Sequence, residues 1–476
     1  MTNDGHELAD EPAAMTFELL KAAVRDGTTV ARLGRLALTG CKSVVDTPNY
    51  FGLTSRGVVP HVTPDNVSKH LQTNGAYLAL EDFIERPQQY STRSPPIYET
   101  PSALGKPLHG FTALPSSFIT VLGARRLPAV PAPAGNTNHA VSIFTSTGFQ
   151  VLPTKDYRNA VQVLKPDIAI PPADLTHGPT TPTSKRAVKM AERTDDWIKE
   201  WFVDDDTTPT ASTFAPVLPI PYSMQWEYLE RLSEDLTTDN RRLAGLALYD
   251  ADIIPDLNHH LPNLLPLPRL SLAAPPTPHH ILRQISLGVD LFALPFINAT
   301  DLSPFVQNCT CYACTRHHRA FVHHLLSAHE MLGWTLLQLH NHAVVAAFFA
   351  GIRQTLAVSD DAFEAARAQF HAVYEPELPA GTGERPRARG YHFKSGAGEG
   401  KRNKPGWGKL GEEEEAAAVA GKAKGDGAAV DGVDGVDGKL QDLSLSGEEV
   451  KIEFLISGTV TGETIGVTEA AVEKDR

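Results

Sequence analysis

Short apolar runs and longer amphipathic stretches follow one another along most of this chain. Four short apolar runs predict buried strands: "AVSIFTSTGF" at 140–149, "KPDIAIPPAD" at 165–174, "RLAGLALYD" at 242–250 and "VDLFALPF" at 289–296. Three stretches with roughly helical apolar spacing predict helices: "SKRAVKMAERTDDWIKEWF" at 184–202, "SMQWEYLERLSEDL" at 223–236 and "HHILRQISLG" at 279–288. Strands that alternate with helices over this length predict a parallel α/β fold, with a closed (β/α)8 barrel of the TIM type favoured.

Composition divides the chain into three parts. Residues 15–378 carry the apolar runs and form one predicted globular unit, preceded by an acidic and flexible N-terminus at 1–14. Residues 379–476 are rich in Gly, Ala and charge and contain a "VDG" repeat. Such a segment cannot bury enough apolar surface to offset its chain entropy, so this tail is predicted to be disordered. Within it, the alternating run "VKIEFLI" at 450–456 could return to the fold as an edge strand.

Charge and hydropathy exclude several classes of protein. The 476 residues carry a formal net charge of −13, so no overall basic field attracts nucleic acid. The N-terminal "MTNDGHELADEP" lacks the apolar core of a secretory signal. The longest apolar run, "AVVAAFFAGI" at 343–352, is shorter than the ~20 residues that a spanning helix needs. We therefore expect a cytoplasmic protein without a transmembrane segment.

Three of the four cysteines, Cys309, Cys311 and Cys314, form a Cys-x-Cys-x-x-Cys cluster. In a reducing compartment such a cluster indicates a metal site, and structural zinc takes four ligands, usually Cys with some His. Spacing alone leaves the fourth ligand open among Cys41 and the histidines that follow the cluster: His317, His318, His323, His324, His329, His340 and His342. His317 would make a compact knuckle. His340, after a helix starting near His317 and a break at Gly333, would clamp a second helix to the cysteine loop.

Two other interpretations of the cluster are weaker. Buried free thiols would not explain three clustered cysteines beside seven histidines, and an iron–sulfur cluster would need a fourth thiolate, which only Cys41 can supply. A closed set of three cysteines and one histidine has no open coordination position. It therefore predicts one structural Zn²⁺ per chain and no metal-activated water.

The segment "CTCYACTRHHRAFVHHLLSAHEMLGWTLLQLHN" at 309–341 resembles the zinc module of the tRNA-guanine (queuine) transglycosylase family. In that family the histidine of a "LHN" ending closes the site, so the resemblance implies His340 as the fourth ligand, within a zinc subdomain at about 305–356. Weaker similarities occur in the right order in "TPNYFGLTSRGVVPHVTPDNV", "STGFQV" and "GVDLF". The resemblance covers roughly residues 25–355 and implies the same barrel with an inserted zinc subdomain.

The family's enzymes exchange a base in tRNA, using one aspartate as nucleophile and a second as general acid/base. The resemblance places the nucleophile position at Ala293 and the acid/base position at Thr145, neither of which can do that chemistry. Asp290 lies three residues before Ala293, so on a strand it should face the opposite side. No residue of this chain is therefore expected to be catalytic.

Other positions of the family pattern also differ. The base-contacting Gln-Gly-Gly segment is replaced by "VLPIP" at 217–221, a Gly before an acid becomes Tyr249, and a Gly-rich "MGVG" segment is roughly "LAAP". Bulky residues at Gly positions would obstruct the approach of a ligand to the backbone. Asp174 matches the family's base-reading carboxylate and Ser146 the serine beside the lost acid. For Asp174, a structural role as a cap or loop carboxylate is at least an equal alternative.

Within the family, this combination resembles a noncatalytic subunit. The resemblance implies a heterodimer with a catalytic queuine tRNA-ribosyltransferase subunit, contact with tRNA through that complex, and exchange of guanine for queuine at wobble position 34 of tRNAs with GUN anticodons. Peripheral association with the mitochondrial outer membrane is implied by the resemblance only. The alternatives are an active transglycosylase with relocated acids and a zinc-containing tRNA-binding scaffold outside queuosine metabolism.

Overall fold

A computed structural model of the chain describes most of its first 376 residues. The described residues are 15–25, 28–38, 43–85, 94–102, 105–132, 135–176, 181–203, 211–237, 243–294, 309–328, 330–374 and 376. The predicted flexible N-terminus at 1–14, the predicted disordered tail at 379–476 and the strand suggested at 450–456 lie outside these residues. The boundary at 378 therefore stays a prediction.

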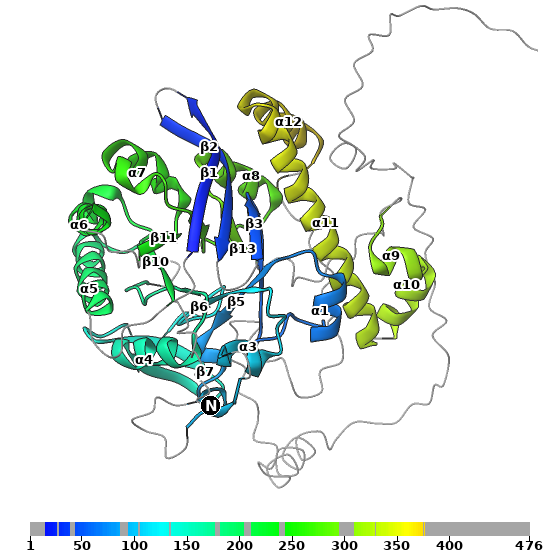
Figure 1. The fold of residues 1–476 in the computed structure, drawn as a ribbon, viewed down its shortest axis with the longest axis horizontal. Coiled ribbons are helices and arrows are strands. Elements are labelled where there is room, and N and C mark those ends of the chain that lie inside the picture. The colour runs from blue at the N-terminus through cyan, green and yellow to red at the C-terminus, as the bar shows by residue number, and fades with distance from the viewer. Residues whose placement is uncertain are drawn as a thin grey trace, which may run out of the picture. The chain divides into compact units, whose positions relative to one another are not determined.

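Eight parallel strands close into a barrel, as the alternating pattern predicts (Figure 1). In chain order they are β4 (Asn49–Leu53), β5 (Gly75–Ala79), β6 (Ile119–Gly123), β9 (Ile168–Ala169), β10 (Ser212–Val217), β11 (Leu243–Leu248), β12 (Arg269–Ser271) and β13 (Leu291–Leu294). The last strand pairs with the first, with Leu291 opposite Asn49 and Ala293 opposite Phe51. The TIM-type architecture is confirmed.

Side-chain alternation along the strands divides the core into a barrel interior and an outer layer. On β13, Leu291 and Ala293 face the interior, whereas Phe292 and Leu294 pack outward against the helices. The interior also holds Phe51, Tyr77, Val121, Ile168, Phe214, Ala247 and Leu270. The covering helices include α4 (Thr154–Leu164), α5 (Ser184–Phe202), α6 (Trp226–Thr237), α7 (Ile254–His260) and α8 (Pro278–Leu287). The barrel is thus filled by side chains and is not an open pore.

The strands differ from the sequence expectation in two ways: one predicted strand lies outside the barrel, and the four predicted apolar runs do not include the barrel strands β4, β5, β6, β10 and β12. The run at 140–149 does not enter the barrel, because β7 (Ala140–Thr145) pairs antiparallel with β8 (Gly148–Pro153) as a separate hairpin. Conversely, β10 is a barrel strand that the sequence reading missed, since its Pro216 suggested an irregular segment. Shorter elements join the strands: α1 (Pro64–His70), η1 (Leu80–Asp82), α2 (Pro96–Glu99), α3 (Pro107–Thr112), η3 (Tyr222–Met224), η4 (Ala251–Ile253) and η5 (Pro262–Leu264).

An antiparallel sheet of β1 (Met15–Arg25), β2 (Thr28–Leu38) and β3 (Ser43–Thr47) covers the end of the barrel where the strands begin. Leu36, Leu38 and Val45 of this sheet join the interior apolar cluster. The sheet therefore closes the N-terminal end of the barrel and leaves the opposite end for a site.

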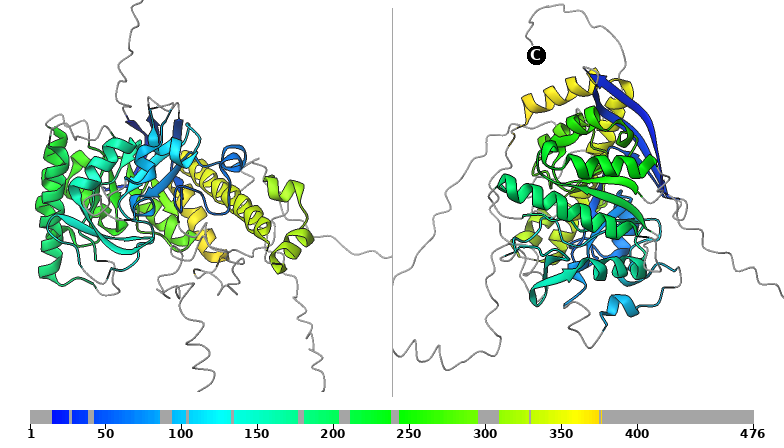
Figure 2. Two further views of the ribbon diagram at one scale, coloured as in Figure 1. Left: turned by 90° about the horizontal axis from the view of Figure 1, so that it is seen from below. Right: turned by 90° about the vertical axis from the view of Figure 1, so that its left-hand side faces the viewer.

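Among the described residues after the barrel there are four helices: α9 (Tyr312–Arg316), α10 (Arg319–Ser327), α11 (Met331–Val358) and α12 (Asp360–Val373). Figure 2 shows α11 running from the barrel to the small α9–α10 unit. Gly333 was expected to break the helix, but it lies inside α11. A Cβ atom there would be 3.1 Å from the Leu325 Cβ, so the glycine allows α10 and α11 to pack closely.

Helix α11 is 28 residues long, far longer than its ten-residue apolar run suggested. By length and composition alone it is apolar enough to cross a membrane. Half of its most apolar window is buried inside the protein, and the core helix of a soluble protein passes the same test. Phe349, Ile352 and Leu356 of α11 belong to the cluster outside the barrel, which accounts for much of that hydropathy.

Candidate metal centre and barrel mouth

Four side chains converge on one point beside the start of α9. The Sγ atoms of Cys309, Cys311 and Cys314 lie 3.7, 3.6 and 3.3 Å from the Nδ1 atom of His340. All four ligand atoms lie within 4.8 Å of one another. In a tetrahedral site, a Zn–S bond of about 2.3 Å and a Zn–N bond of about 2.0 Å place sulfur and nitrogen about 3.5 Å apart. The arrangement therefore fits a tetrahedral metal ion.

Local structure brings these ligands together. Cys311 is the N-cap of α9, and its Sγ accepts a hydrogen bond of 3.4 Å from the Cys314 backbone N–H, which fixes the Cys311 side chain over the first turn of the helix. His340 lies on α11 and is only 2% exposed. Ala313, Val322, Leu325, Leu336 and Leu337 form a small apolar core behind the ligands. So few apolar residues make a weak core, which a metal crosslink would reinforce.

Electrostatics also favours a cation at this point. Burial raises the pKa of the Cys314 thiol well above its ordinary value, and the adjacent Cys311 side chain raises it further. Burial raises the pKa of Cys311 too, while the backbone N–H of Cys314 opposes this. The raised pKa values make Cys311 and Cys314 poor thiolates on their own, whereas a bound dication stabilises deprotonated sulfurs.

The other candidate ligands are placed elsewhere or lie outside the described residues. The His317 ring stacks on Phe321 at 5.5 Å between centroids and meets Tyr312 edge-on, so His317 packs with aromatic rings and does not join the cluster. His342 is buried against Tyr50. Cys41 lies outside the described residues. His340 is the histidine that the structure brings to the three cysteines.

The position that the resemblance assigns to the nucleophile is an apolar part of the barrel. Ala293 is 0% exposed and belongs to the interior cluster with Tyr77, Leu272 and Tyr249. Tyr249 also packs against a second cluster, formed by the end of β9 and by α5. Tyr249 therefore packs against both the barrel interior and the cluster beside α5.

The position assigned to the acid/base is the end of a hairpin. The Thr145 hydroxyl lies 2.9 Å from the Glu85 carbonyl, 3.0 Å from the Thr147 hydroxyl and 3.1 Å from the Gly148 carbonyl. Thr145 is 1% exposed. Its hydroxyl holds the β7–β8 turn, and this role differs from proton transfer to a ligand.

Glu81, a carboxylate close to Thr145, was not predicted from the sequence as a functional residue. Its carboxylate accepts hydrogen bonds from the Phe144 N–H at 2.7 Å and from the Arg126 N–H at 2.8 Å, and it pairs with the Arg126 guanidinium. Burial raises the pKa of Glu81, and Arg126 opposes that rise. Since the side chain is 0% exposed, Glu81 braces the hairpin and does not face a ligand.

Asp290 points away from Ala293, as side-chain alternation predicts. Its carboxylate pairs with the Arg32 guanidinium of β2 and accepts a hydrogen bond of 2.7 Å from the Arg269 N–H. Asp290 and Arg32 are both 0% exposed along their side chains. This buried pair ties the N-terminal sheet to the start of β12 and β13.

Asp174 is 0% exposed and is held by three side chains. Arg186 binds it in a bidentate manner at 2.7 and 2.8 Å, Arg193 at 2.6 Å and Asn136 at 2.8 Å. Asp174 is therefore a loop carboxylate in an arginine network, and it is not a helix cap, because α5 is capped by Thr183. The sequence shows Arg186 and Arg193 at helical spacing on α5, but not which acid they meet.

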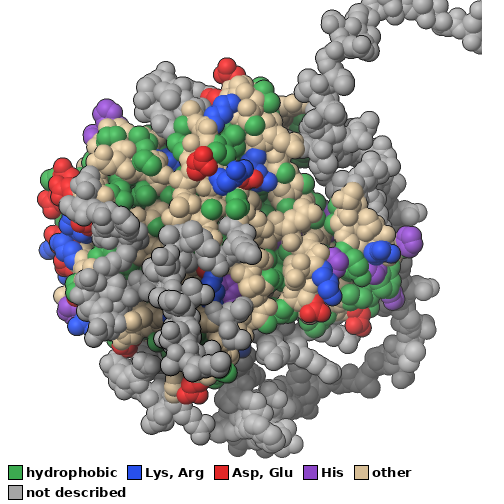
Figure 3. Space-filling model, viewed as in Figure 1, with side chains coloured by type: hydrophobic (Ala, Val, Ile, Leu, Met, Phe, Trp, Pro, Cys, Tyr) green, Lys and Arg blue, Asp and Glu red, His purple; other side chains and the backbone are tan. Residues whose placement is uncertain are grey.

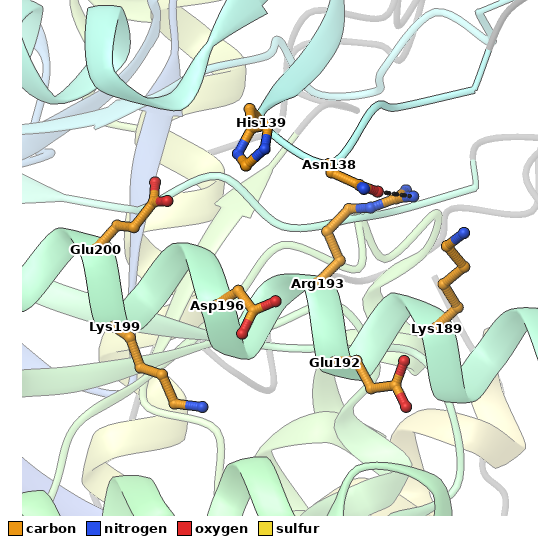
Figure 4. A pocket seen from close by; sticks show the side chains of 8 residues that line it. All are labelled: Asn138, His139, Lys189, Glu192, Arg193, Asp196, Lys199 and Glu200. Atoms are coloured by element: carbon orange, nitrogen blue, oxygen red, sulfur yellow. Dashed lines mark hydrogen bonds between the residues drawn. The ribbon is translucent and has the colours of Figure 1, made fainter.

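A cleft of about 510 Å³ lies beside this network, between α5 and the loop before β7 (Figure 4). It is lined by Asn138, His139, Lys189, Glu192, Arg193, Asp196, Lys199 and Glu200. Figure 4 shows Arg193 reaching toward Asn138, with a hydrogen bond of 3.0 Å. Cations and carboxylates alternate around the cleft, so it favours neither sign of charge.

Comparison with known proteins matches these features. A family model described as queuine tRNA-ribosyltransferase matches residues 26–300 and 297–376. The chain belongs to this family. An accessory subunit 2 of queuine tRNA-ribosyltransferase from Schizosaccharomyces pombe is 30% identical over 410 residues, covering 78% of this chain and 88% of the relative. Similarly named relatives are 26% identical over 375 residues in Drosophila persimilis, covering 68% and 86%, and 27% over 368 residues in Culex quinquefasciatus, covering 65% and 81%.

Membership of the queuine tRNA-ribosyltransferase family confirms the resemblance seen in the cysteine module and the barrel motifs. The matched residues span both the barrel strands and α9–α11. The residues matched by the family model thus include both the metal cluster and the altered barrel mouth.

Proposed function

We propose that this chain is a noncatalytic subunit of a heterodimeric queuine tRNA-ribosyltransferase. Its catalytic partner exchanges guanine for queuine at wobble position 34 of tRNAs with GUN anticodons, and this chain contributes to that complex without chemistry of its own. The complex is proposed to work in the cytoplasm, which subcellular fractionation of a tagged chain tests.

The observation that carries the proposal is Ala293. Covalent base exchange needs a nucleophile at this position, and a fully buried methyl group supplies none. The surroundings support the same conclusion, since Thr145 holds a turn and Asp174 is occupied by arginines. The names of the matched relatives, accessory subunit 2, support the assignment of the chain to a multisubunit enzyme.

The metal of this chain is proposed to be zinc in a structural role. Cys309, Cys311, Cys314 and His340 form a closed set with the donor types and spacing that zinc takes in structural sites. When bound, zinc would crosslink the cysteine loop to α11. The chain's own residues around it, chiefly Leu325, Leu336 and Leu337, hold α10 against α11.

The surface of the α9–α10 unit supports the heterodimer. Tyr312, Phe321, Met331 and Leu332 are between 39% and 57% exposed there. In Figure 3, hydrophobic and histidine side chains gather at the right-hand edge, where Figure 1 places α9 and α10. Exposed large apolar side chains on a small unit are typical of a protein-binding surface.

The test is a queuine-exchange assay with three samples: this chain alone, the catalytic paralogue alone, and both together. We expect guanine release from a cognate tRNA only when both are present. Turnover by the isolated chain that disappears in an Asp174→Ala variant would establish relocated acids. Exchange by the paralogue that is unaffected by this chain would place the protein outside queuosine metabolism.

A further inference from the structure

Two histidine rings meet where the end of α12 packs against α8. His279 lies in the first turn of α8 and His371 in the last turn of α12, and the two helices are in contact (Figure 1). The ring centroids are 4.6 Å apart, with an angle of 64° between the ring planes. Neither residue belongs to the cysteine cluster.

The His279 ring is held through one nitrogen only. Its Nε2 lies 3.1 Å from the Tyr374 carbonyl, to which it donates, because a carbonyl can only accept. In the neutral ring, Nδ1 then carries the lone pair. Within the described residues this Nδ1 is buried without a hydrogen-bond partner, and His279 is only 6% exposed. Buried polar atoms are nearly always bonded, so this nitrogen indicates a place where another group binds.

A histidine in this state has the arrangement of a metal ligand. Metal-binding histidines usually donate their second ring N–H to a carboxylate or a backbone carbonyl, which fixes the tautomer and the orientation of the ring. The Tyr374 carbonyl has that role for His279. A second imidazole, that of His371, lies beside the ring and is exposed, so it can turn toward the same point.

The distance between the two rings fits a shared ion. With a metal–nitrogen bond of about 2.0–2.1 Å, each ring centroid would lie about 3.2 Å from the ion. Two such centroids would be roughly 4.5 Å apart at a nitrogen–metal–nitrogen angle of about 90°, and roughly 5.2 Å apart at about 109°. The separation of 4.6 Å lies within this range.

We propose that His279 and His371 form a second metal site, for a divalent transition-metal ion that prefers imidazole, such as Zn²⁺ or Ni²⁺. The two rings supply two ligands, and water would complete the coordination of the ion. Because the ligands come from two helices, a bound ion would link the last turn of α12 to the first turn of α8. Such a site is additional to the cysteine cluster and independent of the proposed subunit role.

Hydrogen exchange with nickel as the probe tests this site. Full-length protein that carries its structural zinc is titrated with NiCl₂, and exchange is followed in peptides from α8 and α12. At ten times the midpoint concentration, exchange in the last turn of α12 should slow about tenfold, because opening must first release the ion. MgCl₂ at the same concentration should have no effect, since Mg²⁺ prefers oxygen ligands.

Three variants assign the effect to the two rings. His371→Ala should abolish the slowing in α12 and should fold normally, because His371 is exposed. His279→Gln keeps a donor for the Tyr374 carbonyl and should abolish it too. His280→Ala is the matched control and should keep the slowing, since the Nδ1 of His280 lies 2.7 Å from the Thr277 hydroxyl. Equal slowing in His371→Ala, or no slowing in the unmodified chain at millimolar nickel, would overturn the proposal.

Discussion

Buried histidines give the chain a measurable response to acid at the scale of single residues. His109 on α3 is 4% exposed, and its Nε2 contacts the Phe118 carbonyl at 3.0 Å. Burial lowers the pKa of His109, and Lys106 lowers it further. The Phe118 carbonyl and Asp167 oppose this change. The folded chain therefore holds a neutral imidazole that the unfolded chain would protonate.

Because folding lowers the pKa of His109, the direction in which stability changes with pH is fixed. The stability that neutral His109 contributes is present above the ordinary histidine value of 6.5 and is lost as the pH falls below it. We expect His109→Gln, which keeps a donor for the Phe118 carbonyl, to reduce the dependence of unfolding free energy on pH below that value. The reduction should approach about 1.4 kcal/mol per pH unit. Urea unfolding at several pH values checks this, and identical pH slopes in both proteins would contradict it.

The metal ligands can be separated residue by residue. Purified chain should carry about one zinc ion, measured by mass spectrometry of the metal content. His340→Ala should lose most of it and become less soluble, because its loss breaks the link between α11 and the cysteine loop. His317→Ala is the matched control and should keep its zinc, since His317 packs on Phe321. The reverse result would identify His317 as the ligand.

At the scale of elements, Lys21 links the first strand to the last turn of α11. Its Nζ donates to the carbonyls of Leu356, Ala357 and Val358 at 3.0, 3.0 and 3.1 Å. These carbonyls have no partner within the helix, and a cation there also meets the negative end of the helix dipole. A single side chain thus fixes β1 to an element more than 300 residues away in sequence.

Removing that amine should loosen the end of α11. We expect Lys21→Met to lower the free energy of unfolding by about 1 kcal/mol, because three partly exposed charge-assisted bonds are lost. Lys21→Arg should recover most of the loss. Chemical denaturation gives the magnitude, and hydrogen exchange should locate it in the last turn of α11. An unchanged stability in Lys21→Met would mean that water caps the helix equally well.

Local patterns predicted some elements well and left others hidden. The 19 residues of α5 run from Ser184 to Phe202, as helical spacing predicts. Pro216 concealed β10, because proline weakens the sequence signal of a strand although the barrel accommodates it. The antiparallel partner of β7 depends on the turn at 145–148, and the apolar run alone could not show this. The three thiol ligands followed from spacing, but His340 needed the family resemblance, since only the α10–α11 fold selects it among the histidines.

Long-range contacts at the barrel mouth were the least predictable part of the site. The sequence shows Ala293 and Thr145, and so the loss of both acids. It does not show that Arg186 and Arg193 turn toward Asp174, because that depends on how α5 lies against the end of β9. The outward direction of Asp290 followed from strand alternation alone.

At the scale of the whole molecule, the exposed tip around α10 should mark the partner interface. With the catalytic paralogue bound, hydrogen exchange should slow in α10 and in the first turns of α11. Leu332→Glu should weaken the complex about tenfold or more, since it places a charge in an apolar contact. Trp226→Glu on α6 is the control, because both side chains are 46% exposed and α6 lies on the other side of the barrel. Equal weakening by both variants would move the interface elsewhere.

The pairing that closes the barrel cannot form until the ribosome has synthesised β13. Strand β4 pairs with β13, whose first residue, Leu291, follows Asn49 by about 240 residues. At ~5–20 residues per second, a ribosome needs roughly 10–50 seconds to bridge that interval. During this time the edge of β4 that faces β13 has no partner, and an open strand edge invites pairing with other chains. Nascent chains should therefore need chaperone protection until β13 emerges, and messages truncated before it should yield aggregates.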